Sequence, residues 1–168
     1  MIEQSEKRRM VMIVKSLNLK RLVINLAVPL LAGAAAGLLS PDTAQIYKTL
    51  EKPLLSPPGI LFPAVWTVLY ILMGISAYMI TEQKGQKIKD IMKLYYIQLF
   101  LNFLWPVIFF TFGLYWAAAG ELVILWAVCI LVFWNFFLTD RTAAWLFLPT
   151  IIWVSFAGYL NVSTALLN

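Results

Sequence analysis

The 168-residue sequence contains no histidine and a single cysteine. Without histidine, the chain lacks the commonest general base, the commonest metal ligand and the usual axial ligand of haem. The one thiol, Cys129, lies in an apolar stretch, which excludes an internal disulfide and argues against a reactive thiol. We therefore expect neither a metal site nor a cofactor, and we identify no catalytic residue.

Acidic residues are also scarce, with eight Asp and Glu against thirteen Lys and Arg. Only Glu121 lies well inside an apolar run. A carboxyl group is costly inside a membrane and is a functional candidate there, although accepting hydrogen bonds from neighbouring helices explains it equally well. The net charge of +5 does not indicate nucleic-acid binding, because the basic residues form short clusters between apolar runs.

Apolar residues dominate the rest of the chain. Hydrophobic residues make up 62% of it and charged residues 12%, far from the balance of a soluble domain. Runs of about 20 residues, long enough to cross a bilayer, recur along the sequence. We expect an all-α integral membrane protein, a five-transmembrane-helix bundle in one domain over residues 1–168. A basic segment over 1–21 precedes the expected spans, which are 22–39, 60–80, 91–112, 114–138 and 142–160.

The first span also allows a second interpretation. A basic stretch, an apolar run and the small-residue patch AGAAAG at 32–37 are typical of a signal peptide, whose cleavage would leave four spans. Gly33 and Gly37, four residues apart, equally suit close helix packing in a membrane bundle, which favours five spans.

The basic residues predict the orientation of the bundle. With the N-terminus inside, eleven of the thirteen Lys and Arg residues fall on the cytoplasmic side, and only Lys48 and Lys52 fall on the other. The C-terminus and the first loop are then outside. That loop contains Pro53, Pro57 and Pro58 followed by Gly59, and proline fixes its own backbone angle, so we expect a stiff lid that ends where the second span begins.

Aromatic residues with a few amides form stripes at helical spacing. The third span carries Tyr95, Gln98, Asn102, Trp105 and Phe109, the second carries Trp66 and Tyr70, and the fifth carries Trp153 and Ala157. Such stripes can cradle a flat, largely apolar ligand, or they can serve only as contacts between helices. Counting the rise per residue places Trp66, Asn102, Glu121, Trp153 and Ala157 in the outer half of the membrane, beneath the lid.

Three segments resemble a known family. They are YKTLEKPLLSPPGILFPAVWTVLYILMGISAY at 47–78, QLFLNFLWPVIFF at 98–110 and LPTIIWVSFAGYLNVSTALLN at 148–168. A Pro-Pro loop, an Asn-x-x-Trp helix and a Trp-x-x-Phe-Ala-x-x-Leu-Asn helix occur in that order. This combination resembles the tryptophan-rich sensory protein or translocator protein family (TspO/MBR, the peripheral benzodiazepine receptor family).

The resemblance implies a five-helix protein of a bacterial plasma membrane that binds porphyrins, other tetrapyrroles and similar flat hydrophobic ligands under the first loop. It also implies a link to tetrapyrrole transport or signalling, as a sensor, receptor or carrier. Membrane lipid is then the second partner, no nucleic acid is expected, and a homodimer is kept as an alternative. By motif, the pocket positions are Trp66, Asn102, Trp153 and Ala157. With the neighbouring Tyr70 and Trp105 and the intramembrane Glu121, they complete our predicted ligand-binding set.

The sequence departs from the family pattern at two places. Leu55 stands where the family often has a tryptophan between the loop prolines, so a stacking partner in the lid is missing. The chain after Leu160 lacks the tyrosine and basic residue of the sterol motif claimed for animal members. Two other functions stay open. One is light-dependent and oxygen-dependent degradation of protoporphyrin through tryptophan, and the other is export of hydrophobic cations with Glu121 as the proton-coupled site.

Overall fold

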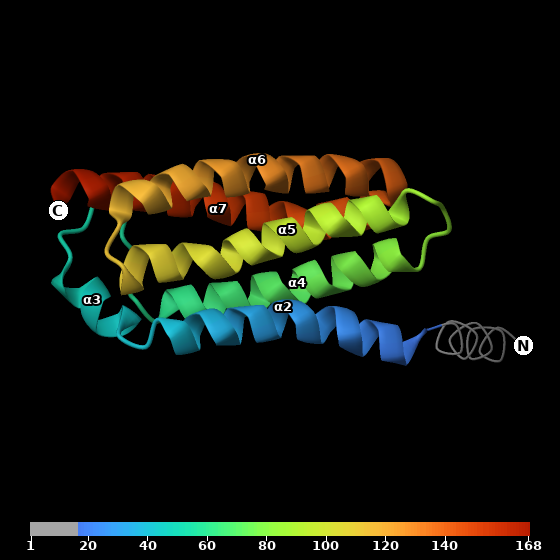
Figure 1. Ribbon diagram of the computed structural model, residues 1–168, viewed down its shortest axis with the longest axis horizontal. Coiled ribbons are helices and arrows are strands. Elements are labelled where there is room, and N and C mark those ends of the chain that lie inside the picture. The colour runs from blue at the N-terminus through green and yellow to red at the C-terminus, as the bar shows by residue number, and fades with distance from the viewer. Residues whose placement is uncertain (1–16) are drawn as a thin grey trace, which may run out of the picture.

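The computed structural model describes residues 17–168, which form long antiparallel helices (Figure 1). The long helices are α2 (Leu19–Leu39), α4 (Leu61–Thr81), α5 (Ile88–Pro106), α6 (Tyr115–Thr139) and α7 (Arg141–Leu167). α5 continues into a π-helical turn, η1 (Val107–Thr111), and the first loop contains a short helix, α3 (Thr43–Thr49). Five helices in this part of the chain are long and apolar enough to cross a membrane, which confirms the expected all-α, five-span architecture.

The helix bounds differ from the expected spans mainly at the end of the chain. The fifth span was expected to end at residue 160, whereas α7 continues to Leu167. Polar residues such as Asn161 and Thr164 interrupt the apolar run there, but both side chains are buried inside the bundle. Between η1 and α6 the chain reverses at Gly113, whose φ of 64° lies in the left-handed region that glycine adopts without strain.

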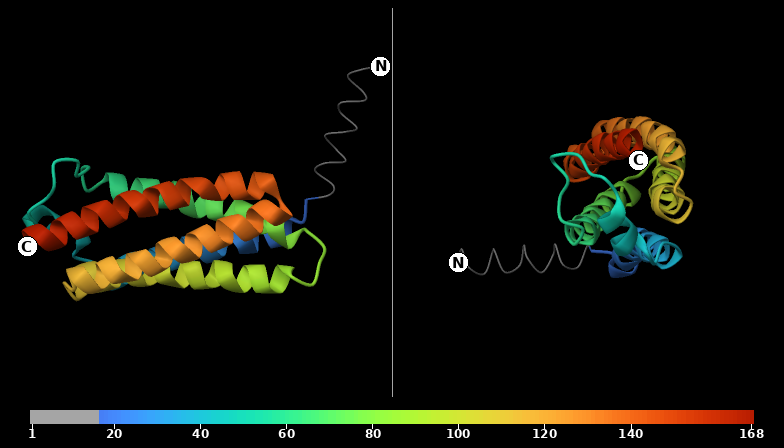
Figure 2. Two further views of the ribbon diagram at one scale, coloured as in Figure 1. Left: turned by 90° about the horizontal axis from the view of Figure 1, so that it is seen from above. Right: turned by 90° about the vertical axis from the view of Figure 1, so that its left-hand side faces the viewer.

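The five long helices form a closed ring. α2 lies beside α4 and α5, α4 beside α7, α7 beside α6, and α6 beside α5. Figure 2 shows the ring end-on, with the first loop crossing one end of the bundle. α4 and α7 are tied by a buried hydrogen bond in which the Ser76 hydroxyl donates to the Ala143 carbonyl at 2.6 Å.

Glycine brings α2 and α4 close together. A Cβ atom at Gly74 of α4 would lie 2.8 Å from the carbonyl oxygen of Asn25 and 2.9 Å from the Cα of Leu26, so only glycine permits this crossing. Farther along, the Tyr70 ring of α4 occupies the space that a side chain at Gly33 would need. Gly33 therefore serves close packing, as its spacing suggested, whereas nothing lies within 4 Å of a Cβ built at Gly37.

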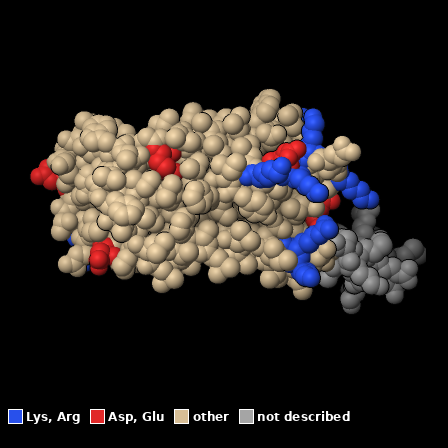
Figure 3. Space-filling view, in the orientation of Figure 1, with Lys and Arg blue, Asp and Glu red and all other residues tan. Residues whose placement is uncertain are grey.

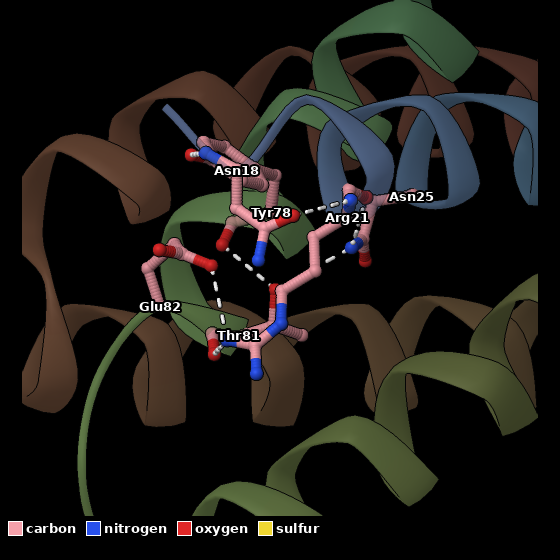
Figure 4. Close-up of polar contacts among 6 residues, drawn as sticks. All are labelled: Asn18, Arg21, Asn25, Tyr78, Thr81 and Glu82. Carbon is pink, nitrogen blue, oxygen red and sulfur yellow. Dashed lines mark hydrogen bonds and ion pairs between the residues drawn. The ribbon is translucent and has the colours of Figure 1, made fainter. Parts of the chain in front are cut away.

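A polar clasp joins α2 and α4 at the opposite end from the first loop (Figure 4). Arg21 donates from Nη1 to the Glu82 carboxylate at 3.1 Å and lies 3.5 Å from the Thr81 carbonyl. The Asn18 backbone N–H donates to the Tyr78 hydroxyl at 3.2 Å. Because these groups lie at the helix ends, water and lipid headgroups can solvate the charges that the clasp leaves exposed.

The charged side chains are sorted to the ends of the bundle. Figure 3 shows Lys and Arg gathered at the right-hand end of the visible face, while the flank between the ends is almost free of charge. The helix bounds place Lys20, Arg21, Arg141 and the basic residues of the α4–α5 connection at this end, and Lys48 and Lys52 at the other. Four further basic residues used to predict the orientation, Lys7, Arg8, Arg9 and Lys15, lie outside the described residues.

This charge distribution generates a prediction about topology. A reporter fused after Asn168 should report a location outside the cytoplasm, because Lys and Arg are retained on the cytoplasmic side of a membrane. Two reporters make the measurement at this one position. One is active only inside the cytoplasm, and the other is active only outside it. An inside signal would contradict the orientation that the basic residues predict.

Candidate ligand-binding site

A cavity of about 350 Å³ lies between α2, α3, α4 and α5. Figure 1 shows the first loop, with α3, at this end of the bundle. Its lining is largely apolar and aromatic, as is usual for small-molecule sites. The lining residues are Gly33, Ala36, Gly37, Ser40, Pro41, Thr43, Ala44, Tyr47, Gly59, Phe62, Pro63, Trp66, Tyr70, Asn102, Trp105, Pro106 and Phe110.

Two aromatic walls face the cavity. On α4, Trp66 stacks on Tyr70 with ring centroids 5.5 Å apart and an interplanar angle of 27°. On α5, the buried Trp105 supplies the second wall, with Phe110 edge-on to it at 6.0 Å. Offset-stacked and edge-to-face rings are the favoured arrangements of aromatic pairs, so these walls are well ordered before any ligand arrives.

Asn102 supplies an unpaired polar group beside the walls. Its amide nitrogen donates to the Gln98 carbonyl of the preceding turn at 3.2 Å. Its Oδ1 atom is buried and has no hydrogen-bond partner in the described part of the chain. An unpaired acceptor in a water-poor interior is costly, and because Oδ1 itself is buried, a donor in the cavity reaches it only when the side chain turns toward the cavity.

The roof of the cavity comes from α3 and from the end of the first loop. Thr43, Ala44 and Tyr47 of α3 line it, together with Gly59. The Tyr47 hydroxyl donates to the Pro57 carbonyl at 2.6 Å, which ties the helix to the loop. Burial raises the pKa of Tyr47, with a smaller opposing effect from Ser56, so the phenol keeps the proton that it donates.

The proline-rich segment lies over this roof instead of lining the cavity. Pro57 and Pro58 line a shallow outer pocket beside α3, and Pro53 lines neither that pocket nor the cavity. Leu55, at the place of the family's loop tryptophan, is 65% exposed and points away from the protein. The loop is also tied to α7, because the Asn168 amide accepts from the Glu51 N–H at 3.1 Å and donates to the Glu51 carbonyl at 3.0 Å.

The structure brings together four of the seven predicted ligand-binding residues. Trp66, Tyr70, Asn102 and Trp105 line the cavity, and Trp153, Ala157 and Glu121 do not. The depth count placed five of the seven, including these three, in one half of the bundle, but depth says nothing about direction around the ring. α6 and α7 lie on the far side of the ring, behind the α5 aromatics. A role in binding for these three residues stays a prediction.

Trp153, Ala157 and Glu121 each have a different environment. Trp153 lines an apolar groove between α4 and α7 and stands behind Phe62, with ring centroids 6.0 Å apart. Ala157 lines a void of only about 20 Å³. Glu121 is 8% exposed, and neither carboxyl oxygen has a hydrogen-bond partner within residues 17–168.

Sequence reasoning missed the contribution of α2 and α3. The small residues Ala36 and Gly37 of α2, with Ser40 at its C-terminal cap, leave room for the cavity, and Tyr47 of α3 closes it. The small-residue patch was a usable signal, but the same pattern also suits a helix contact and a cleavage site. α3 is only seven residues long and lies beside the loop prolines, so nothing in its sequence separates it from the loop.

Two consecutive phenylalanines lie in the π-helical turn, and both are buried. Phe109 and Phe110 are each less than a tenth exposed. The wider turn follows Pro106, which lacks the N–H that would bind the Asn102 carbonyl. Thr111 secures the turn against α2 by donating to the Leu39 carbonyl at 2.9 Å.

Comparison with known proteins identifies the family. Residues 25–167 match the TspO/MBR family. The chain belongs to the TspO/MBR family. The match runs from α2 to the last residue of α7, so it includes all five long helices and every wall of the cavity. It confirms the resemblance seen in the three sequence segments.

Individual TspO/MBR relatives cover most of the chain. It is 37% identical over 142 residues to "Tryptophan-rich protein TspO" of Chlorobaculum tepidum, which covers 83% of this chain and 90% of that protein. It is 39% identical over 145 residues to "Protein CrtK" of Rhodobacter capsulatus, covering 82% and 86%. A "Translocator protein" of Bos taurus is 34% identical over 119 residues, covering 68% and 70%.

The roof contacts generate a prediction about the lid. Replacing Tyr47 by Phe should loosen the first loop, because the hydrogen bond to the Pro57 carbonyl is lost while the ring packing stays. A lost hydrogen bond of this kind costs about 1 kcal/mol, so the loop should open roughly five times more often. Hydrogen exchange of the 50–60 backbone, or limited proteolysis of that loop, measures the opening. Tyr159→Phe, at an exposed position of α7, is the matched control, and equal exchange in both variants would contradict the latch.

Proposed function

We propose that this chain is a membrane-embedded binding protein, a sensor or carrier, for porphyrins and similar flat hydrophobic ligands. The observation that supports this most is the cavity itself. It combines aromatic walls from α4 and α5 with the buried, unpaired Oδ1 atom of Asn102. A flat aromatic molecule can lie against such walls, and a pyrrole N–H in its ring is a donor of the kind that this acceptor lacks.

The location of the cavity also favours a ligand that partitions into membranes. It lies within the end of an apolar bundle and not in a water-exposed domain, and most of its lining is carbon. The roof is held by the hydrogen bonds of Tyr47 and Asn168 and by packing of the Tyr47 ring on Phe62, so opening it breaks a small set of contacts while the long helices stay packed. Sensing and carrying both need such reversible access, and we propose the two together.

Substitution of Trp66 tests the proposed site. Trp66→Ala should weaken protoporphyrin binding by at least about tenfold, because it removes the larger of the two rings that form the α4 wall. Titration of the purified protein with protoporphyrin, followed through tryptophan fluorescence, measures the dissociation constant. Trp134→Ala is the control, since Trp134 lies toward the other end of α6 and is 57% exposed.

The proposal fails if Trp134→Ala weakens binding as much as Trp66→Ala in proteins of equal thermal stability. Illumination of the same protein–protoporphyrin samples separates binding from chemistry. If illumination in the presence of oxygen bleaches bound protoporphyrin in the wild type and not in a control membrane protein, the degradative alternative is favoured over a sensor or carrier.

Glu121 favours a second candidate function, the proton-coupled export of hydrophobic cations. Its carboxyl group is buried in the apolar bundle, and neither oxygen is paired with any described side chain or backbone group. Buried ionisable groups of this kind occur in the proton relays of transporters. Because Glu121 lies outside the cavity lining, this function would be separable from porphyrin binding.

The Glu121→Gln variant separates the two candidates. Glutamine keeps the shape of the side chain but cannot exchange a proton, so it should abolish proton-driven export of tetraphenylphosphonium from vesicles. Protoporphyrin affinity should stay within about twofold of the wild type. Unchanged export in the variant would exclude Glu121 as the proton-coupled site, and the absence of export in the wild type would exclude the exporter.

A further inference from the structure

Two hollow spaces share one aromatic wall. The cavity of about 350 Å³ and the void of about 20 Å³ lie on opposite sides of the same four side chains. These side chains, which we call the aromatic partition, are Tyr47, Phe62, Trp105 and Phe110. The void lies on the α7 side, where Ala157, Leu160, Asn161 and Thr164 line it.

The side chain of Trp105 is held in the partition by its one hydrogen-bond donor, the indole N–H. Its Nε1–H donates to the Asn161 Oδ1 atom at 2.9 Å, and the Asn161 amide donates in turn to the Tyr115 carbonyl at 2.8 Å. Asn161 is 1% exposed and Trp105 is 7% exposed, so no water competes for these groups. The bonds join α5, α7 and the start of α6, and they fix the indole from the side away from the cavity.

The remaining members of the partition are held more weakly. Phe62 contacts Tyr47 with ring centroids 5.2 Å apart, and Phe110 contacts Trp105 at 6.0 Å. These are apolar contacts that can be exchanged for contacts with another aromatic surface at little cost. The Asn161 bond is different, because breaking it leaves a buried indole N–H unpaired. Asn161 is therefore the latch that decides whether the partition can move.

Because the cavity is small, the latch affects which sizes of ligand can bind. About 350 Å³ is near the lower end of the roughly 300–1,000 Å³ typical of sites for drug-sized molecules. A flat ligand of three fused rings fits such a space, whereas a porphyrin is a four-ring macrocycle that carries side chains. To accept the macrocycle, the site needs more room on one side. The adjoining void beside Ala157 holds little more than a water molecule, so that room comes from moving the Trp105 indole that separates the two spaces.

We propose that Asn161 is a positioning residue that sets the largest ligand the site accepts, by latching Trp105 between the cavity and the α7 void. When Trp105 leaves Asn161, the two spaces join and a flat ligand extends to Ala157. Small ligands bind with the latch closed, and large ligands bind only with it open. The choice of a porphyrin as the large ligand rests on the proposed function.

The Asn161→Leu variant tests the latch. Leucine has the same branching as asparagine but offers no acceptor to the indole, so the closed state loses its bond. Opening then costs less, and the affinity for protoporphyrin should rise by about three- to tenfold, the factor that one such bond contributes. The affinity for acridine, a flat three-ring probe, should stay within about twofold, because it does not need the open state.

A second variant and a matched control protect the test against general effects on folding. Trp105→Phe removes the same bond from the other partner and should shift the ratio of the two affinities in the same direction. Ser155→Ala breaks the other indole bond to α7, in which Trp126 donates to the Ser155 hydroxyl at 2.9 Å on the outer face. It should change neither affinity, and thermal unfolding of all four proteins shows whether they are equally folded.

The possible outcomes separate this inference from the proposed function. If protoporphyrin binds the wild type and Asn161→Leu changes both affinities alike, or leaves protoporphyrin unchanged or weaker, the latch is overturned and the proposed function stands. If the wild type binds acridine alone and Asn161→Leu gains protoporphyrin, the latch is supported and porphyrin is not a ligand of the wild type. If the wild type binds neither probe, both proposals fall. They also fall if the wild type binds acridine alone and Asn161→Leu gains no protoporphyrin binding.

Discussion

The absence of water from the bilayer core is the constraint on which the rest of this structure depends. Every buried polar group must find its partner inside the protein, and a group that finds none is costly. Charged side chains are accordingly sorted to the ends, where the Arg21–Glu82 clasp joins α2 to α4. Within the spans, Ser76 and Asn161 bind carbonyls of neighbouring helices. Seven buried side-chain atoms of the described residues have no partner; among them are the Oδ1 atom of Asn102, which lines the cavity, and both oxygens of Glu121, the one buried carboxyl group.

The same constraint shapes the cavity, because a space inside a membrane bundle must be lined mainly by apolar atoms. α2 approaches α4 closely at Gly74, and at Gly33 it makes room for the Tyr70 ring. Beyond that point α2 carries small residues such as Gly37, and the two helices are separated by the cavity instead of by side chains. One helix pair therefore supplies both a contact that only glycine permits and one side of the cavity.

Aromatic residues in the site differ in how firmly they are held. Trp66 and Tyr70 stack on each other and need no polar partner to keep their orientation. Trp105 is fixed by a hydrogen bond to Asn161, so its position depends on one interaction with a distant helix. Tyr47 is intermediate, since its ring packs on Phe62 and its hydroxyl ties the loop. The proposed site therefore combines one wall of stacked rings, one wall held by a hydrogen bond and a roof tied by the Tyr47 hydroxyl.

The sequence by itself determined the five spans, because apolar runs of membrane length have no other stable environment. It also determined which end carries the basic residues and which residues of α4 and α5 share a face, since helical spacing fixes those relations. It could not place Trp153, Ala157 and Glu121 relative to the cavity, because direction around the ring depends on which helices are neighbours. Only the tertiary structure decided that α2 and α3 complete the cavity while α6 and α7 lie behind Trp105. The physical reason is that periodicity describes one helix at a time, whereas a cavity is defined by contacts between helices far apart in sequence.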